Sequence, residues 1–341
     1  MTFAQTAAYY GERLPLPDSL SKAAIALLVD QTRRKLGDTT IDADRVFTRD
    51  MAHYPIATHT SDANAQHYEI PESFFALCLG PQRKYSCCLY DGGIDTLAAA
   101  EERALAATAE NAGLADGQRI LELGCGWGSL SLWMARHYPA ARITSVSNSH
   151  SQRAYILARA QAEGLGNLKV VTADMNSFEP DGPFDRVVSV EMFEHMANWG
   201  PLLQRIRRHL AGDGRLFIHI FTHRTTPYRF RVEDKDDWIA QHFFSGGIMP
   251  SHRLIRQFPE LFAVEQEWRW NGLHYRKTAQ HWLENFDANA DAIRAILRDV
   301  YGADAALWQR RWRLFFLATG GLFGHDDGRE WGVSHFRLLP V

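Results

Sequence analysis

Two carboxylates and an imidazole lie close together in the segment V-S-V-E-M-F-E-H-M, residues 188–196. Glu191, Glu194 and His195 come directly after an apolar run that predicts a buried strand. Charged groups at the end of such a strand lie next to the crevice where open α/β sheets bind ligands. Together they can accept a proton or hold a cation. The alternative is that Glu191 caps a helix and the other two face solvent, but position and composition together favour chemistry.

A second polar cluster follows in F-I-H-I-F-T-H, residues 217–223. His219 and His223 are four residues apart, so on a strand they share a face. No third metal ligand is spaced near them, and we therefore predict no metal. We expect His219 to point into the site and His223 to begin the following loop.

The element that must position these groups is a glycine-rich turn in R-I-L-E-L-G-C-G-W-G-S-L-S-L-W-M, residues 119–134. Gly124, Gly126 and Gly128 separate a buried strand from a mostly apolar helix, the start of a nucleotide-binding unit. The spacing is G-x-G-x-G, whereas dinucleotide-binding sites use G-x-G-x-x-G with an acidic residue after the next strand. No Asp or Glu ends that strand, so a nicotinamide dehydrogenase is disfavoured.

Strands alternate with helices over the middle of the chain. Strands are predicted at 119–123, 142–147, 168–172, 184–190 and 214–221, and helices at 128–137, 151–163 and 199–210. This order predicts an α/β fold with a mainly parallel sheet and helices on both faces. We expect a mostly helical segment at 1–94 that helps to cover the active site, and a ligand-binding domain at 95–341. Within that domain we expect a covering insert at 223–262, then strands at 265–270 and 333–339 and helices at 277–300 and 303–316.

Composition narrows the class of protein. The apolar fraction of 46% is enough for a large core, and the net charge of −3 does not favour nucleic acid as a partner. The four cysteines form no C-x-x-C pair. We predict no transmembrane segment and no signal peptide, which makes a cytoplasmic protein the default.

Six segments together resemble the cyclopropane fatty acid synthase superfamily of S-adenosylmethionine (SAM)-dependent methyltransferases, which have the Rossmann-like class I fold. They are K-Y-S-C-C, L-E-L-G-C-G-W-G-S, S-N-S-H-S-Q, E-M-F-E-H-M, F-I-H-I-F-T-H and N-G-L-H-Y. Within the superfamily, F-F-S-G-G-I-M-P-S and the C-terminal F-F-L-A-T-G-G-L-F-G-H-D-D-G-R-E-W resemble the coclaurine N-methyltransferase branch. The resemblance covers about residues 68–341.

The resemblance implies a set of residues that contact SAM: Tyr85, Ser86, Glu122, Gly124, Gly126, Asn148, Gln152, Asp174 and Met175. In the N-methyltransferase branch, the positions that match Glu194 and His195 act in the active site, with Glu191 close by. In the cyclopropane branch a bicarbonate ion serves as base. The matching bicarbonate cradle here would be formed by Cys87, Glu194, His219 and Tyr275.

The resemblance leads to N-methylation of a small, aromatic or alkaloid-like amine as the first functional hypothesis. The alternative is methylene transfer to an unsaturated phospholipid acyl chain, as in cyclopropane-fatty-acyl-phospholipid synthases. Gly320 stands where those enzymes carry a cysteine, which disfavours that alternative. A third hypothesis, a SAM-binding sensor without turnover, does not explain the cluster at 191–195. The oligomeric state stays open, with a homodimer as one option.

Overall fold

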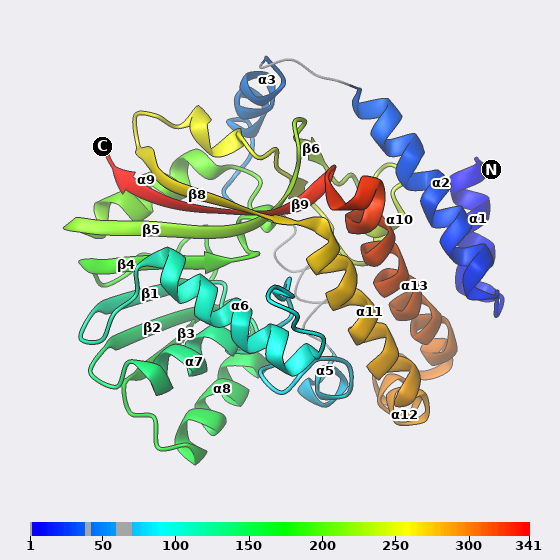
Figure 1. The fold of residues 1–341 in the computed structure, drawn as a ribbon, viewed down its shortest axis with the longest axis horizontal. Coiled ribbons are helices and arrows are strands. Elements are labelled where there is room, and N and C mark those ends of the chain that lie inside the picture. The colour runs from blue at the N-terminus through cyan, green and yellow to red at the C-terminus, as the bar shows by residue number, and fades with distance from the viewer. Residues whose placement is uncertain (1, 38–41, 59–69) are drawn as a thin grey trace.

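A seven-stranded mixed sheet forms the centre of the protein, in the order β3-β2-β1-β4-β5-β9-β8 (Figure 1). The computed structural model describes residues 2–37, 42–58 and 70–341. The strands of the sheet are β1 Arg119–Leu123, β2 Arg142–Ser147, β3 Leu168–Thr172, β4 Phe184–Val190, β5 Leu210–His223, β8 Phe262–Asn271 and β9 Trp331–Pro340. The helices are α1 Phe3–Arg13, α2 Asp18–Leu36, α3 Asp42–Met51, α5 Glu72–Cys78, α6 Leu97–Ala112, α7 Ser129–His137, α8 His150–Ala162, α9 Trp199–Arg208, α10 Trp238–His242, α11 Gly272–Ala288, α12 Ala290–Tyr301 and α13 Ala305–Gly324.

The strands from β1 to β5 are parallel, and β9 pairs antiparallel with both β5 and β8. The first four strands have the predicted bounds. β5 is longer at both ends than the predicted 214–221: it begins at Leu210, which pairs with Phe184 of β4, and continues to His223, which pairs with Trp331 of β9. The strand order reverses between β1 and β4, so the carboxyl ends of these two strands flank the crevice in which such sheets bind ligands.

Helices cover both faces of the sheet, as the sequence predicts, because successive residues of a buried strand point to opposite sides. Ile120 of β1 packs in a cluster with residues of α6 and α7. Leu121 and Leu123 belong to a different cluster, which includes Trp199 and Leu203 of α9. The two hydrophobic layers fix the sheet from both sides and leave its carboxyl edge for the site.

The C-terminal helices differ from the prediction in two places. The helix expected at 277–300 is two helices, α11 and α12, separated at Asn289. The amide of Asn289 donates to the carbonyls of Leu77 (3.1 Å) and Asn285 (2.9 Å), so its side chain competes with helical continuation. α13 is longer than expected and continues through Gly320 and Gly321 to Gly324.

The N-terminal helices lie against the C-terminal helices, far away in sequence. α1 and α2 pack on α13, as Figure 1 shows. Glu12 of α1 accepts from Arg311 at 2.9 Å, and Thr2 donates to Asp236 of the insert at 2.7 Å. The insert at 223–262 contains β6 Tyr228–Arg229, α10 and β7 Ile248–Met249. The division at residue 94 stays a prediction, since α5 packs against α11 and α8.

In the described parts of the chain, the helices are too short or too polar to cross a bilayer.

Candidate active site

The glycine turn after β1 lies flush against the segment that carries the carboxylates. Gly124 has φ +79°, and a Cβ placed there would lie 2.5 Å from Cγ of Met192. Its amide donates to the carbonyl of Val146 at 3.0 Å. Only glycine combines this left-handed backbone with so close an approach. The turn and the segment 191–195 are therefore held side by side at the carboxyl edge of the sheet.

A cavity of about 710 Å³ opens at this edge and continues beneath the N-terminal helices. All of the residues predicted to contact SAM line it: Tyr85, Ser86, Glu122, Gly124, Gly126, Asn148, Gln152, Asp174 and Met175. Glu122 lies in β1 and Gln152 in α8, and the others lie in the segments that follow β1, β2 and β3 or precede α6. Their contact with SAM stays a prediction, but the fold brings them to the same cavity.

The predicted catalytic residues divide into two groups. Glu191, His195 and Tyr275 line the cavity. Cys87, Glu194 and His219 do not line it and have no exposed surface. His223, expected to begin a loop, is the last residue of β5, where it is fully buried and bonded to Glu330 at 2.9 Å.

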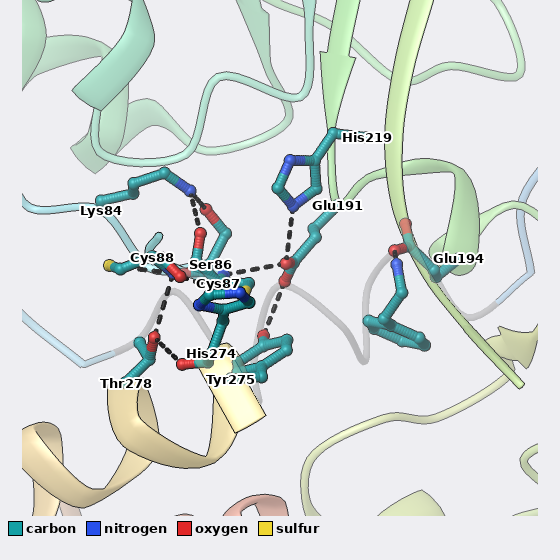
Figure 2. A network of polar contacts seen from close by, with 11 residues as sticks. Lys84, Ser86, Cys87, Cys88, Glu191, Glu194, His219, His274, Tyr275 and Thr278 are labelled. Carbon is teal, nitrogen blue, oxygen red and sulfur yellow. Dashed lines mark hydrogen bonds and ion pairs between the residues drawn. The ribbon is translucent and has the colours of Figure 1, made fainter. Parts of the chain in front are cut away.

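Glu191 is at the centre of a polar network, which Figure 2 shows. Its Oε1 accepts from the Cys87 amide at 2.9 Å and pairs with Nε2 of His219 at 3.2 Å. Its Oε2 accepts from the Tyr275 hydroxyl at 2.7 Å. Burial lowers the pKa of His219 well below its usual value, so we assign a neutral ring that donates from Nε2. Burial and the Glu191 charge raise the pKa of Tyr275, which therefore keeps its proton.

Lys84 supplies the positive charge of this network, although the sequence analysis did not assign it a role. Its side chain is buried, and Nζ donates to the Cys87 carbonyl at 2.7 Å and to the Ser86 hydroxyl at 2.5 Å. Burial raises the pKa of Glu191, and the Lys84 ammonium, the Cys87 amide and the Tyr275 hydroxyl oppose that rise. A lysine two residues before Ser86 in K-Y-S-C-C was the available sequence signal.

Glu194 does not join the cradle that the resemblance implies. Its Oε1 accepts from the Phe221 amide at 2.6 Å, and its Oε2 has no hydrogen-bond partner in the described regions. Figure 2 places it apart from the network around Glu191. Burial and the neighbouring Glu191 charge raise the pKa of Glu194 well above its usual value. Of two close carboxyl groups, one is thus kept neutral and the other carries the charge.

His195 and a group of aromatic side chains line the same cavity. The His195 ring lies 4.3 Å from that of Phe244, which in turn lies 4.9 Å from Phe230. Tyr275 stacks on Phe323 of α13, with ring centroids 4.3 Å apart. This part of the cavity is lined by Phe221, Tyr228, Phe230, Trp238, Phe244 and Phe323. Such ring faces attract ammonium and sulfonium cations.

Sequence reasoning expected the segment 1–94 to help cover the active site but named no residues at the end of the cavity that α1 and α2 line. Ala4, Ala7, Ala8 and Gly11 of α1 lie on this wall, together with Ile25 of α2. The spacing of the small residues at i, i+3, i+4 and i+7 marks one helical face. That stripe was visible in the sequence, but nothing in it indicated which element the face would meet.

Within residues 2–37, 42–58 and 70–341, no cluster of three or more His, Cys, Asp or Glu side chains is arranged to hold a metal ion.

The parallel sheet, its strand order, the glycine turn at its switch point and the adjoining cavity define the class I SAM-dependent methyltransferase fold. The sequence model of the mycolic acid cyclopropane synthetase (CMAS) family matches residues 57–324, and the chain belongs to this family of SAM-dependent methyltransferases.

Named relatives share most of the chain. It is 34% identical over 293 residues to (S)-coclaurine N-methyltransferase of Thalictrum flavum subsp. glaucum, covering 84% of this chain and 81% of the relative. It is 29% identical over 274 residues to the cyclopropane-fatty-acyl-phospholipid synthase of Escherichia coli K12, covering 80% and 67%. The crystal structure of a coclaurine N-methyltransferase bound to N-methylheliamine and SAH is similar at a TM-score of 0.92 and 32% identity, covering 97% and 98%.

Replacing Gly124 by alanine tests whether the turn binds the cofactor. The methyl group would meet Met192 and force a left-handed backbone on alanine, so we expect SAM to bind at least about tenfold more weakly in calorimetric titrations. Gly117→Ala is the matched control, because Gly117 has φ +80°, nothing within 4 Å of the added Cβ, and no place on the cavity wall. It should lose about 1–2 kcal/mol of stability with SAM affinity unchanged. Equal SAM affinity in Gly124→Ala and wild type would contradict the prediction.

Glu122 should make the stability of the fold depend on pH. It is buried and accepts from the hydroxyls of Ser131 and Ser145, and burial raises its pKa from 4.5 to about 7. The folded state therefore holds this proton more tightly than the unfolded state. Its contribution to stability is complete below pH 4.5 and is lost as the pH rises through about 7.

We expect Glu122→Gln, which stays neutral, to gain in unfolding free energy relative to wild type as the pH rises across this range. Urea unfolding of both proteins at a series of pH values measures the difference. Other groups, such as Glu101, whose pKa burial also raises to about 7, cancel in the comparison. A difference that does not change with pH would refute the prediction.

Proposed function

We propose that the protein N-methylates a small, aromatic or alkaloid-like amine with SAM as methyl donor. The observation that carries the proposal is that Glu191 and His195 line the same cavity as the glycine turn. Aromatic rings such as those of Phe230 and Phe244 line the cavity as well. Relatives that carry the names of amine N-methyltransferases align over most of the chain.

An amine needs a free electron pair to attack a methyl group, yet at neutral pH most aliphatic amines are protonated. SAM supplies an electrophilic methyl group on a sulfonium. The N–C bond forms as the C–S bond breaks, and SAH leaves. A protonated amine must therefore lose a proton before the N–C bond forms, so that its electron pair is free to attack. His195 lines the cavity and can take up such a proton, and the Glu191 charge stabilises a cation beside it.

Glu194 supports His195 from behind the cavity wall in this proposal. Its side chain has no exposed surface, and its Oε2 lacks a hydrogen-bond partner within the described residues. A buried polar atom without a partner costs free energy, which favours a role in holding a proton or a ligand group when the site is occupied. Alignment of the nitrogen with the methyl group contributes further to the rate.

Methylene transfer to an acyl-chain alkene is the competing activity, and the name of the E. coli relative gives it to that protein. Two features disfavour it here. Gly320 replaces the cysteine expected from the cyclopropane branch, and the donors expected to hold bicarbonate are bound to Glu191.

The acceptor is identified by offering isotopically labelled SAM together with pooled aromatic and aliphatic amines and vesicles of unsaturated phospholipid. We expect mass spectrometry to find the label on an amine that bears an aromatic ring, because the cavity pairs rings with negative charge. Vesicles without amines and amines without enzyme serve as controls. Label found only on lipid would overturn the proposal.

His195→Asn and Glu194→Gln test the assignment of the proton-handling groups. Loss of a positioned acid–base group typically lowers rates about 10²–10⁴-fold, so we expect kcat to fall in this range with SAM affinity unchanged. His137→Asn is the control, since His137 stacks on Trp133 outside the cavity wall. Turnover of both active-site variants at the wild-type rate would reject the assignment.

A further inference from the structure

The Glu191 carboxylate is held in a socket made by three separate segments. The donors are the Cys87 amide before α6, Nε2 of His219 on β5 and the Tyr275 hydroxyl on α11. Three donors facing two oxygens match an ionised carboxylate, which only accepts hydrogen bonds. The socket is therefore an anion-binding site, and the anion that fills it is the carboxylate of Glu191.

The same donors were expected to hold bicarbonate, and the structure does not fit that ion. Cys87, His219 and Tyr275 all donate to Glu191. The fourth expected member, Glu194, points its Oε1 to the Phe221 amide instead. A bicarbonate ion would have to displace the Glu191 side chain and leave its charge buried without donors, which is costly.

The backbone at Glu191 gives a second, independent observation. Glu191 has φ +48°, in the left-handed region that favours glycine. A non-glycine residue there costs free energy and persists only when its surroundings hold it in place. The surroundings that hold it are the backbone bond from the Glu191 amide to the His219 carbonyl at 2.8 Å and the hydrogen bonds of the socket.

We propose that Glu191 is a built-in substitute for a small carboxylate-like anion, and that the protein needs no free bicarbonate because this socket is filled from within the chain. A carboxylate and bicarbonate both present two oxygens on a planar carbon with a single negative charge. Removing the Glu191 side chain should therefore leave a site of the right shape for formate or bicarbonate. The buried ammonium of Lys84 stays in place to attract it.

Glu191→Gly is the decisive variant, because glycine suits the left-handed backbone and empties the socket. Bicarbonate labelled with ¹³C and formate are titrated into the SAM-bound full-length protein, and binding is followed by NMR line broadening and by the shift in melting temperature. We expect saturable binding of either anion to Glu191→Gly and none to wild type. Glu191→Gln is the matched control, since its amide still fills the socket, and it should bind neither anion.

Tyr275→Phe combined with Glu191→Gly tests whether the anion occupies this socket, because it removes one donor and should weaken anion binding at least about tenfold. Should Glu191→Gly fail to fold, Glu191→Ala empties the same space. A folded, SAM-binding Glu191→Gly or Glu191→Ala protein that binds no anion would overturn the proposal. Bicarbonate binding to wild type with similar affinity would overturn it as well.

Amine methylation gives a separate measurement that rests on the proposed function. Glu191→Gly should lose at least about tenfold in kcat and recover it in part when formate saturates the socket, whereas Glu191→Gln should not recover. If wild type methylates no amine, the proposed function fails while the anion titration still decides the role of Glu191. Anion binding without recovery of kcat would confirm the anion site. It would also show that a negative charge in the socket is not what turnover requires of Glu191.

Discussion

One buried carboxylate joins four segments of this molecule that are separate in sequence. Glu191 follows β4, and it is held by the segment before α6, by β5 and by the first turns of α11. Each of these elements is fixed by its own hydrophobic packing, but their relative placement at the carboxyl edge of the sheet requires a shared polar contact. Because a buried charge without partners is so unfavourable, the network is complete only when all of these elements are in place.

Which groups of the site carry a charge also depends on the network around Glu191. Glu191 and Glu194 are close enough that the charge of Glu191 raises the pKa of Glu194, and the buried Lys84 stabilises only one negative charge. His219 is kept neutral by burial and serves as a donor rather than a base. The result is a wall with one net negative charge beside His195, which suits cationic groups in an otherwise aromatic cavity.

Much of the sheet could be predicted from the sequence, because buried parallel strands are continuous apolar runs with glycine or polar residues at their ends. The four strands β1 to β4 have the predicted bounds, and the residues predicted to contact SAM all line the same cavity. Helix ends that depend on a single side chain were harder to predict from the sequence. Asn289 ends α11 through contacts with Leu77, a residue more than two hundred positions away.

The different surroundings of Glu191 and Glu194 could not be predicted from the sequence either. The two residues are only three positions apart, on a short, irregular segment with a 3-10 turn at Phe193–His195. Only the three-dimensional arrangement shows that Glu191 enters the socket and Glu194 turns to the Phe221 amide. Lys84 was missed for the same reason, since a lone lysine in a sequence is usually a surface residue.

The position of α1 bears on how the shape of the cavity can change during evolution. Its small residues line the end of the cavity farthest from the glycine turn, and it is attached to the rest of the molecule by polar contacts such as those of Thr2 and Glu12. Enlarging or reducing the side chains of Ala4, Ala7 or Ala8 changes the space at this end of the cavity and leaves Glu191 and His195 untouched. Substitutions on one peripheral helix can therefore alter which molecules fit the cavity without changing the polar network around Glu191.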